Sequence, residues 1–352
     1  MTDVVFWLPA INPYWNDRFK ALAKDGRVTF SCWFNSHIDP TRSWKVDRND
    51  MLYPHEFLPG SPTARYYRAA QLYKQSDPDR LFTFHFDPAL WPAWCHWIRG
   101  RHLALYTLMT WDTWVKRARH KEVAKRWFFG SASSVLTPGP DSDAWAKRYG
   151  ARTVFRLHHA VDTEGLATAA AQRVRSERLR VLYVGRYVQE KGLDHLLRVI
   201  EETEALGVEV EWRFVGSGPY AGELQRFATS RPNVRVDGFV TASELPSVYA
   251  QSDVLVFPTL GDPYGLVVDE ALAAGMPVVS SAQAGDIGWR LAEGRGYVLE
   301  VTDHRLWAET ISRLAANGSL LETASAAATR FSTGHNVDRW VDELVEWIGA
   351  TS

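Results

Sequence analysis

Cysteine is scarce in this chain of 352 residues, which contains only Cys32 and Cys95. Two cysteines cannot form the disulfide framework of a small secreted domain, and they do not make a cysteine-type zinc site. No apolar run approaches the roughly 20 residues needed to span a bilayer. The first residues also lack the basic start and the cleavage site of a signal peptide. We therefore expect a protein of the reducing cytoplasm.

An excess of charge of either sign is also missing. The formal net charge is -1 and the isoelectric point is near 6.8, whereas nucleic-acid-binding domains are usually basic. We therefore expect no nucleic-acid partner. Repeats and low-complexity tracts are absent too, and the length favours two domains over one.

The second half of the chain alternates strand and helix patterns. Apolar, β-branched runs predict strands at 179–184, 209–215, 234–236, 254–257 and 277–280. Helical spacing of apolar residues predicts helices at 193–204, 222–229, 243–250 and 265–274. This order is typical of a doubly wound parallel sheet, in which every strand-to-helix loop lies at one ligand-binding edge.

The first half has a less regular pattern. Strands are predicted at 4–8, 28–34, 103–108 and 134–137. The small and polar run 167–173 indicates a linker, and residues 337–348 carry one apolar helical stripe.

Tryptophan is concentrated in the first half, where 11 of the 16 tryptophans precede residue 164. Large aromatic side chains are mostly buried, which favours a core filled with aromatics. The alternative is an acceptor cleft whose walls stack on sugar rings, with Trp91, Trp94 and Trp97 on one helical face if Pro92 begins that helix.

The most informative segment runs from Asp262 to Glu270. It follows the predicted strand 254–257 and enters the predicted helix 265–274. Backbone N–H groups near Tyr264, Gly265 and Leu266 are expected to be free at the start of that helix. Such donors bind phosphate, and carboxylates bind sugar hydroxyls. The segment therefore predicts a site for an anion flanked by hydroxyl groups.

This segment resembles the E-x7-E signature of retaining glycosyltransferases of family 4, with Asp262 in place of the first glutamate. Residues 181–192, with Gly185-Arg186 and Lys191-Gly192, resemble the same family's strand, Gly-Arg turn and Lys-Gly. Residues 214–219 and 234–240 continue the series in order. The resemblance covers residues 178–330 strongly and the first 160 residues weakly.

The resemblance implies a GT-B architecture, with two Rossmann-like domains facing each other across a cleft. We expect an acceptor-side domain at 1–163 and a nucleotide-sugar-binding domain at 178–330. The terminal helix 337–348 would pack back on the first domain. The implied reaction moves a sugar from a nucleotide diphosphate sugar to a hydroxyl acceptor (a glycan, a lipid-linked intermediate or a natural product) with retention. No metal and no separate cofactor are expected.

Arg186, Lys191 and Asp262 are the predicted catalytic residues. Two cations and a helix N-terminus can stabilise a departing diphosphate without a metal ion. The resemblance places Asp262 at the transferred sugar and Glu270 at the ribose, while Asp269 is expected on the solvated face. Further donor contacts are expected from the backbone or side chains of Gly185, Gly216, Gly238, Phe239, Val240, Tyr264, Gly265 and Leu266. For Phe239, a place in the buried core is the alternative.

The first domain departs from the family pattern in two places. The loop 9–15 has no glycine, although relatives carry a glycine-rich loop after the first strand. The segment 107–112 has no histidine, so Thr110 or Asp112 is the candidate for a sugar contact there, with a helix cap as the alternative. These departures leave open an inactive nucleotide-sugar-binding protein. A nucleotide-sugar epimerase or a sugar phosphorylase on the same scaffold is the other alternative.

Residues 114–129 are basic and amphipathic. An ordinary helix with a solvated charged face explains this pattern. The alternative is contact with a phosphate-bearing acceptor or with an anionic membrane surface, which would place the enzyme at the inner face of the membrane.

Overall fold

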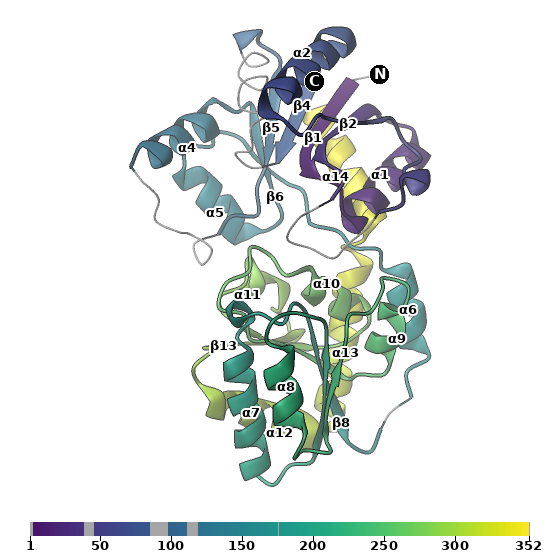
Figure 1. Cartoon of the computed structure of the whole chain (residues 1–352), viewed down its shortest axis with the longest axis vertical. Helices are drawn as coiled ribbons and strands as arrows, with labels where there is room; N and C mark the ends of the chain where they lie inside the picture. Colours follow the sequence, from purple (N-terminus) through teal and green to yellow (C-terminus); the bar gives the residue numbers. More distant parts are fainter. Residues whose placement is uncertain (1–2, 39–45, 85–97, 111–118, 175, 352) are drawn as a thin grey trace. The chain divides into compact units, whose positions relative to one another are not determined.

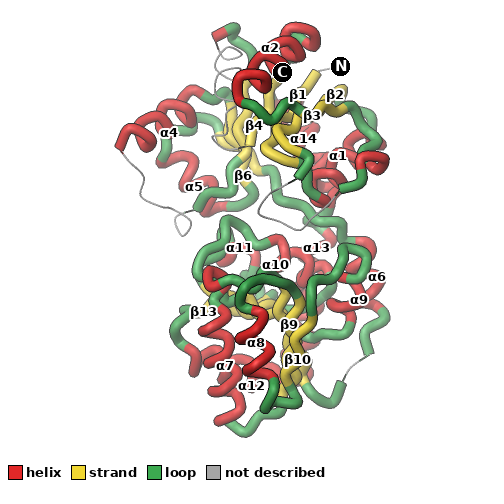
Figure 2. Tube along the Cα trace, in the orientation of Figure 1, coloured by secondary structure: helices red, strands yellow, loops and turns green. Residues whose placement is uncertain are grey.

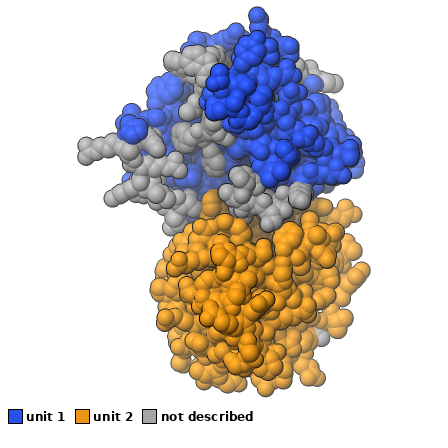
Figure 3. Space-filling view, in the orientation of Figure 1, with its two compact units in different colours: residues 1–160, 337–352 blue, residues 161–336 orange. Residues whose placement is uncertain are grey.

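The computed structural model describes residues 3–38, 46–84, 98–110, 119–174 and 176–351. The chain forms two compact units, residues 1–160 with 337–352 and residues 161–336 (Figure 3). Each unit contains one sheet of parallel strands flanked by helices (Figures 1 and 2). The predicted α/β class with two Rossmann-like domains is thereby confirmed.

The first unit has a seven-stranded sheet in the order β3-β2-β1-β4-β5-β6-β7. Its strands are β1 (Asp3–Ala10), β2 (Thr29–Ser36), β3 (His55–Phe57), β4 (Arg80–Phe84), β5 (His102–Tyr106), β6 (Ser134–Thr137) and β7 (Val154–Arg156). Its described helices are α1 (Pro13–Asp25), α2 (Pro62–Ser76), α4 (Arg119–Ser131), α5 (Pro140–Arg148) and α14 (Val337–Ala350), with a 3-10 turn η1 (Arg48–Asp50).

Aromatic side chains fill the first unit on both faces of its sheet. Trp7 packs on the face covered by α2, α4 and α5, while its neighbour Phe6 points to the other face and contacts Phe19 at 5.1 Å between ring centroids. On that second face Trp15 of α1 meets Trp340 of α14 at 6.0 Å. Among the described tryptophans that precede residue 164, the core interpretation is confirmed for Trp7, Trp15, Trp33 and Trp145 and is wrong for Trp127, which is 48% exposed. Trp91, Trp94 and Trp97 lie outside the described residues.

The second unit has a six-stranded sheet in the order β10-β9-β8-β11-β12-β13. Its strands are β8 (Leu179–Val184), β9 (Val210–Val215), β10 (Val234–Asp237), β11 (Val254–Phe257), β12 (Val278–Ser281) and β13 (Gly296–Leu299). The chain builds outward from β8 to β10 and then returns to place β11 on the other side of β8. The boundary between β8 and β11 is therefore the topological switch point of this sheet, where open α/β sheets bind ligands.

Helices cover both faces of the second sheet. They are α6 (Glu164–Ala171), α7 (Leu193–Ala205), α8 (Ala221–Ala228), α9 (Leu245–Ala250), α10 (Leu266–Ala273), α11 (Ile287–Arg290), α12 (His304–Ala316) and α13 (Gly318–Thr333), with a 3-10 turn η2 (Gln189–Lys191). Val254 and Val256 of β11 point to the core under α7, α8 and α12, and Leu255 and Phe257 point to the core under α6, α9, α10 and α13. Burial on both faces explains the continuous apolar runs in the sequence.

Two sequence expectations about local structure are wrong. Residues 167–173 do not form a linker, because α6 occupies 164–171 and buries Leu166 in the core of the second unit. Alanine is a strong helix former, and four alanines occur in this helix. The loop 9–15 is also shorter than expected: β1 extends to Ala10, and α1 begins at Pro13 with Asn12 as its cap.

Candidate functional site

The predicted residues meet where β8 and β11 end. The loop 185–191 follows β8, and the loop 258–265 follows β11. Lys191 Nζ lies 2.6 Å from Asp262 Oδ2, and the two side chains are only 8% and 15% exposed. A short ion pair therefore joins the two loops at the topological switch point of the sheet.

The loop after β8 carries both predicted cations. Arg186, which is 36% exposed, pairs with the carboxylate of Glu190. Tyr183 donates its hydroxyl to the backbone carbonyl of Arg186 at 2.9 Å. Burial raises the pKa of Tyr183 well above its ordinary value, so this phenol remains a hydrogen-bond donor. The backbone beside Arg186 is thus fixed, while its charged end stays accessible.

Gly192 allows the two loops to approach each other. It has a φ of +68°, and a Cβ atom here would overlap the backbone carbonyl of Pro258 in the loop after β11. Glycine tolerates both the positive φ and the close contact. In the Lys191-Gly192 pair, the lysine therefore supplies the charge and the glycine allows the two loops to pack closely.

Asp262 organises the loop after β11. Its Oδ1 accepts a hydrogen bond from the backbone N–H of Tyr264 at 3.0 Å. The expectation that the N–H of Tyr264 is free is therefore wrong, because an Asx-turn uses it. The backbone of Asp262 also bonds to Gln283 and Gly285, which ties this loop to the one after β12.

The backbone N–H groups of Gly265 and Leu266 differ from that of Tyr264. Gly265 has a φ of +75° and stands just before α10. Within the described part of the chain, neither N–H has a hydrogen-bond acceptor. These donors, together with the positive end of the α10 dipole, favour an anion at this point.

Glu270 is buried in α10, and its carboxylate is 2.6 Å from the hydroxyl of Tyr249, which donates to it. Sequence patterns did not single out Tyr249, because an apolar position of a short helix predicts only a core residue. Asp269 is not on a solvated face, as was expected: its side chain is 11% exposed and pairs with the fully buried Arg290 at 3.0 Å.

The loops after β9 and β10 carry the remaining predicted residues. Gly216 N–H donates to the carbonyl of Gly238 at 3.2 Å, and a Cβ on Gly216 would overlap the carbonyl of Gly185. The buried-core interpretation of Phe239 is wrong, because this side chain is 53% exposed. Val240 is partly buried against the core of the second unit.

The candidates in the first unit do not form a comparable cluster. Thr110 is fully buried, and Asp112 lies outside the described residues. His158 bonds to Glu343 at 2.8 Å, and His159 bonds to Tyr106 at 3.1 Å. Both histidines thus take part in hydrogen bonds that hold the first unit together.

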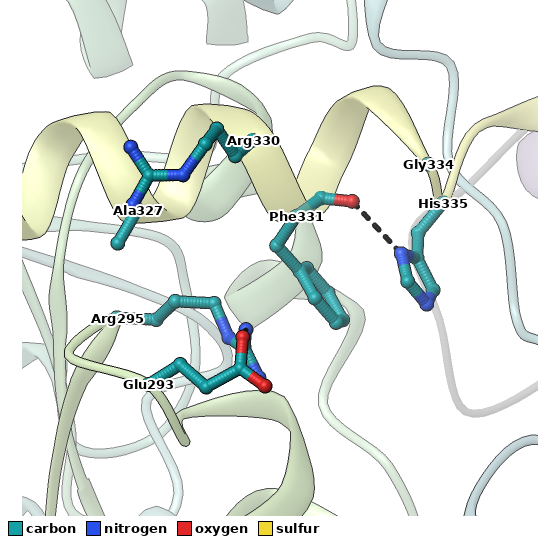
Figure 4. Close-up of a pocket in the computed structure, with 7 residues that line it drawn as sticks. All are labelled: Glu293, Arg295, Ala327, Arg330, Phe331, Gly334 and His335. Carbon is teal, nitrogen blue, oxygen red and sulfur yellow. Dashed lines mark hydrogen bonds and ion pairs between the residues drawn. The ribbon is translucent and has the colours of Figure 1, made fainter.

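A separate hollow of about 260 Å³ lies beside the end of α13 (Figure 4). It contains none of the predicted residues; Glu293, Arg295, Arg330, Phe331 and His335 are among its lining residues. His335 stacks on Phe331 with 3.9 Å between ring centroids, and Arg295 covers Phe331 at 4.4 Å. Arg295 pairs with Glu293 at 2.9 Å, and His335 Nδ1 lies 2.8 Å from the carbonyl of Phe331, so these polar groups are engaged with neighbours at the hollow.

The described residues contain neither a metal-ligand cluster nor a membrane-spanning helix. In that part of the chain, no group of three or more His, Cys, Asp or Glu side chains is arranged to hold a metal ion. No described helix is both long enough and apolar enough to cross a bilayer.

Comparisons with solved structures bear on the fold. The chain resembles sucrose-phosphate synthase from Thermosynechococcus elongatus, with a TM-score of 0.78, 17% identity and complete coverage of both chains. It also resembles HepE from Anabaena in complex with UDP, with a TM-score of 0.76, 16% identity, and 99% and 100% coverage. These likenesses support the GT-B fold and extend over both units.

Relatives found by sequence match smaller parts of this chain than the solved structures do. A D-inositol 3-phosphate glycosyltransferase of Salinispora arenicola is 30% identical over 188 residues, which are 52% of this chain and 37% of that protein. A GDP-mannose-dependent alpha-(1-6)-phosphatidylinositol monomannoside mannosyltransferase of Mycolicibacterium smegmatis is 29% identical over 240 residues, 65% of this chain and 58% of that protein. The matched regions thus span between about a third and three fifths of these relatives.

The family model described as Glycosyl transferases group 1 matches residues 178–317. This range lies inside the second unit, and it contains both loops of the candidate site. The chain therefore carries a glycosyl transferases group 1 domain in its second unit.

Proposed function

We propose that this protein transfers a sugar from a nucleotide diphosphate sugar to a hydroxyl acceptor, with retention at the anomeric carbon and without a metal ion. One observation carries the proposal. At the switch point of the second sheet, the Lys191–Asp262 pair joins two loops that also supply Arg186 and the start of α10.

The diphosphate binds by replacing the carboxylates that now pair with Arg186 and Lys191. Arg186 and Lys191 are each held by a carboxylate, from Glu190 and Asp262. A diphosphate carries more charge than one carboxylate, and it offers oxygens to the fork of Arg186 and the point charge of Lys191. The N–H groups of Gly265 and Leu266 complete the set of donors.

The nucleoside is bound beside the diphosphate. Glu270 accepts hydrogen bonds from the ribose hydroxyls, and Tyr249 holds its carboxylate in place. Exposed Phe239 provides a ring for the base, next to Gly238 and Val240. Stacking on an aromatic ring tolerates any base, which fits a site whose base preference is set by the loops around it.

The chemistry needs no nucleophilic side chain. The acceptor hydroxyl attacks on the face from which the diphosphate leaves, and the departing phosphate oxygen takes the acceptor proton. Arg186 and Lys191 stabilise the charge that develops on that oxygen. Asp262, released from Lys191, contacts the transferred sugar. Retention is supported by the resemblance of Asp262–Glu270 to the family signature.

The acceptor is proposed to be a hydroxyl compound that reaches the first unit, and a membrane-borne acceptor is favoured by α4. Val123 and Trp127, one helical turn apart, are 67% and 48% exposed on this helix. Arg126 is exposed beside them. An apolar pair flanked by a cation fits the surface of an anionic membrane.

Calorimetry with UDP, GDP and dTDP tests the donor site. Wild type should bind one of them, and Arg186→Ala, Lys191→Ala and Glu270→Ala should each lose about 1.5–3 kcal/mol of binding free energy. Lys20→Ala is the matched control, since it removes a surface ion pair with Asp50 at 2.9 Å in the other unit. Wild-type affinity in all three site variants would refute the assignment.

Turnover assays then separate the alternatives. Sugar transfer should continue after dialysis against EDTA, and a complete loss restored by Mg²⁺ or Mn²⁺ would contradict metal independence. Conversion of the donor sugar into its epimer without any acceptor would indicate an epimerase. Binding without turnover on any acceptor would indicate an inactive nucleotide-sugar-binding protein.

A further inference from the structure

Among the described cations of the second unit, Arg290 is the most completely buried, with 0% exposure. Its guanidinium donates to the backbone carbonyl of Tyr264 and, at 2.8 Å, to that of Gly265. It also pairs with Asp269 at 3.0 Å and lies 4.0 Å over the ring of Tyr264. One side chain from α11 therefore holds both peptide groups that precede α10.

The geometry of the peptide bond gives these contacts a consequence on the opposite side. In a trans peptide the C=O and N–H groups point in opposite directions. Because the carbonyls of Tyr264 and Gly265 point to Arg290, the N–H groups of Gly265 and Leu266 point away from it. These are the two N–H groups that have no acceptor within the described residues. Arg290 thus determines where the loop directs its free donors.

Electrostatics keeps the guanidinium charged in its buried place. Burial alone would lower the pKa of Arg290, but the charge of Asp269 and the hydrogen bond to it more than compensate, and the pKa is raised. A charged guanidinium makes stronger hydrogen bonds to carbonyls than a neutral donor does. It also polarises the two peptide groups, which makes their N–H groups better donors to an anion.

The other end of α10 offers an internal comparison. Arg173 donates to the carbonyls of Ala274 at 2.6 Å and Gly275 at 3.4 Å, just after α10 ends. Its guanidinium also binds backbone carbonyls, yet it lies at the end of the helix where no anion is expected. Arg173 and Arg290 thus make similar contacts at opposite ends of one short helix.

We infer that Arg290, held by Asp269, is a positioning residue for the diphosphate: it orients the N–H groups of Gly265 and Leu266 toward the donor phosphates. This inference rests on the proposed function, because it assigns a role within the same site. Arg290 itself does not touch the ligand. Its effect on binding is specific to the phosphates. It does not extend to the base or the ribose, whose proposed contacts lie elsewhere.

The test compares nucleoside diphosphates with the matching monophosphates by calorimetry, using UDP, GDP and dTDP with UMP, GMP and dTMP. Arg290→Lys keeps the charge but removes the fork that binds two carbonyls at once. We expect it to weaken diphosphate binding by about 10- to 100-fold, and monophosphate binding by clearly less. Asp269→Asn, which keeps an oxygen for Arg290 but removes the charge, should produce a smaller loss in the same direction.

Arg173→Lys is the matched control, and it should leave the ratio of the two affinities unchanged even if it lowers the melting temperature. Circular dichroism checks that each variant folds; if Arg290→Lys does not fold, Asp269→Asn decides the question. A wild-type ratio in the folded variants, or an equal loss for diphosphate and monophosphate, would overturn the inference while leaving the donor site intact. If wild type binds none of the nucleotides, the proposed function fails, and this inference fails with it.

Discussion

The two sheets of this protein have the same parallel architecture but very different residues at the carboxyl ends of their inner strands. After β8 in the second unit, the chain makes a loop with Arg186, Glu190 and Lys191. After β1 in the first unit, only Ile11 and Asn12 separate the strand from α1. Ile11 is buried at 4% exposure, and Asn12 caps the helix by accepting from the N–H of Trp15 at 2.9 Å. The fold is therefore shared, and the chemistry depends on what each loop carries.

The difference extends to what stabilises each region. Trp15 stacks on Phe19 at 5.4 Å between centroids and meets Tyr106 at 5.8 Å, so the start of α1 is held by aromatic packing. The loops of the second unit are held by ion pairs and by hydrogen bonds to the backbone. Aromatic packing is difficult to change without loss of stability, whereas an ion pair can be exchanged for a charged ligand.

The largest effect, on stability, is expected from a substitution among the packed aromatic side chains of the first unit. Trp15→Ala should lower the free energy of unfolding by about 3–5 kcal/mol, because it leaves a cavity among buried rings. Chemical denaturation followed by circular dichroism measures this. Trp127→Ala is the control, since Trp127 is 48% exposed and should change stability by less than about 0.5 kcal/mol. Equal effects of the two substitutions would contradict the packing described for α1.

A smaller effect, on turnover and not on stability, is expected at the ion-paired loops. Asp262→Asn should lower kcat by about tenfold to a thousandfold, or roughly 1.4–4 kcal/mol, because a charge near the reacting sugar is lost. Binding of the nucleoside diphosphate should not weaken, since Lys191 no longer has to leave a carboxylate. Steady-state kinetics beside calorimetry measures both quantities. Asp50→Asn, which breaks the exposed pair with Lys20, is the control; full kcat in Asp262→Asn would reduce Asp262 to a turn residue.

The smallest effect expected is a difference between the two units in how their stability depends on pH. Burial and the neighbouring His195 lower the pKa of His304 in the second unit below its ordinary 6.5. Below about pH 6.5, His304 therefore binds a proton more readily in the unfolded chain than in the folded one. The stability that neutral His304 contributes is complete above about pH 6.5 and is lost as the pH falls through the folded-state pKa. In the first unit, burial would raise the pKa of Glu343, but the hydrogen bond from His158 lowers it below 4.5. Its contribution is therefore lost only in more acidic solution.

Thermal unfolding at pH 7, 5.5 and 4 separates these two groups. His304→Asn should reduce the loss of stability between pH 7 and 5.5, and Glu343→Gln should reduce the loss at pH 4. If neither variant differs from wild type in the shape of its pH profile, the two groups do not control acid stability.

The sequence predicted the loops of the second unit better than those of the first for a physical reason. Buried parallel strands such as β11 are continuous apolar runs, and glycine marks the loops that follow them, so 254–257 was located without error. The short strands β3, β7 and β13 carry mostly half-buried residues with no clear period, and they were missed. The buried strand β4 was missed as well, because Arg80 and Thr83 interrupt its apolar residues. Ala167–Ala171 was misjudged because small residues are common to linkers and to tightly packed helices.

Within the site, the charges were predictable and their partners were not. Arg186 and Lys191 follow a glycine-ended strand, which is a local signal. Arg290 and Asp269 are 21 positions apart, and only the fold brings them together. The same holds for Tyr249 and Glu270. Contacts that position a functional group come from packing, which no local pattern of residues records.

A crystal structure of the full chain with the nucleoside diphosphate that it binds tests the donor site most directly. We expect the diphosphate within hydrogen-bond distance of Arg186, Lys191 and the N–H groups of Gly265 and Leu266. Lys191 should have moved from Asp262 to a phosphate oxygen. A nucleotide bound elsewhere, with the Lys191–Asp262 pair still intact at the end of β11, would contradict this assignment of the donor site.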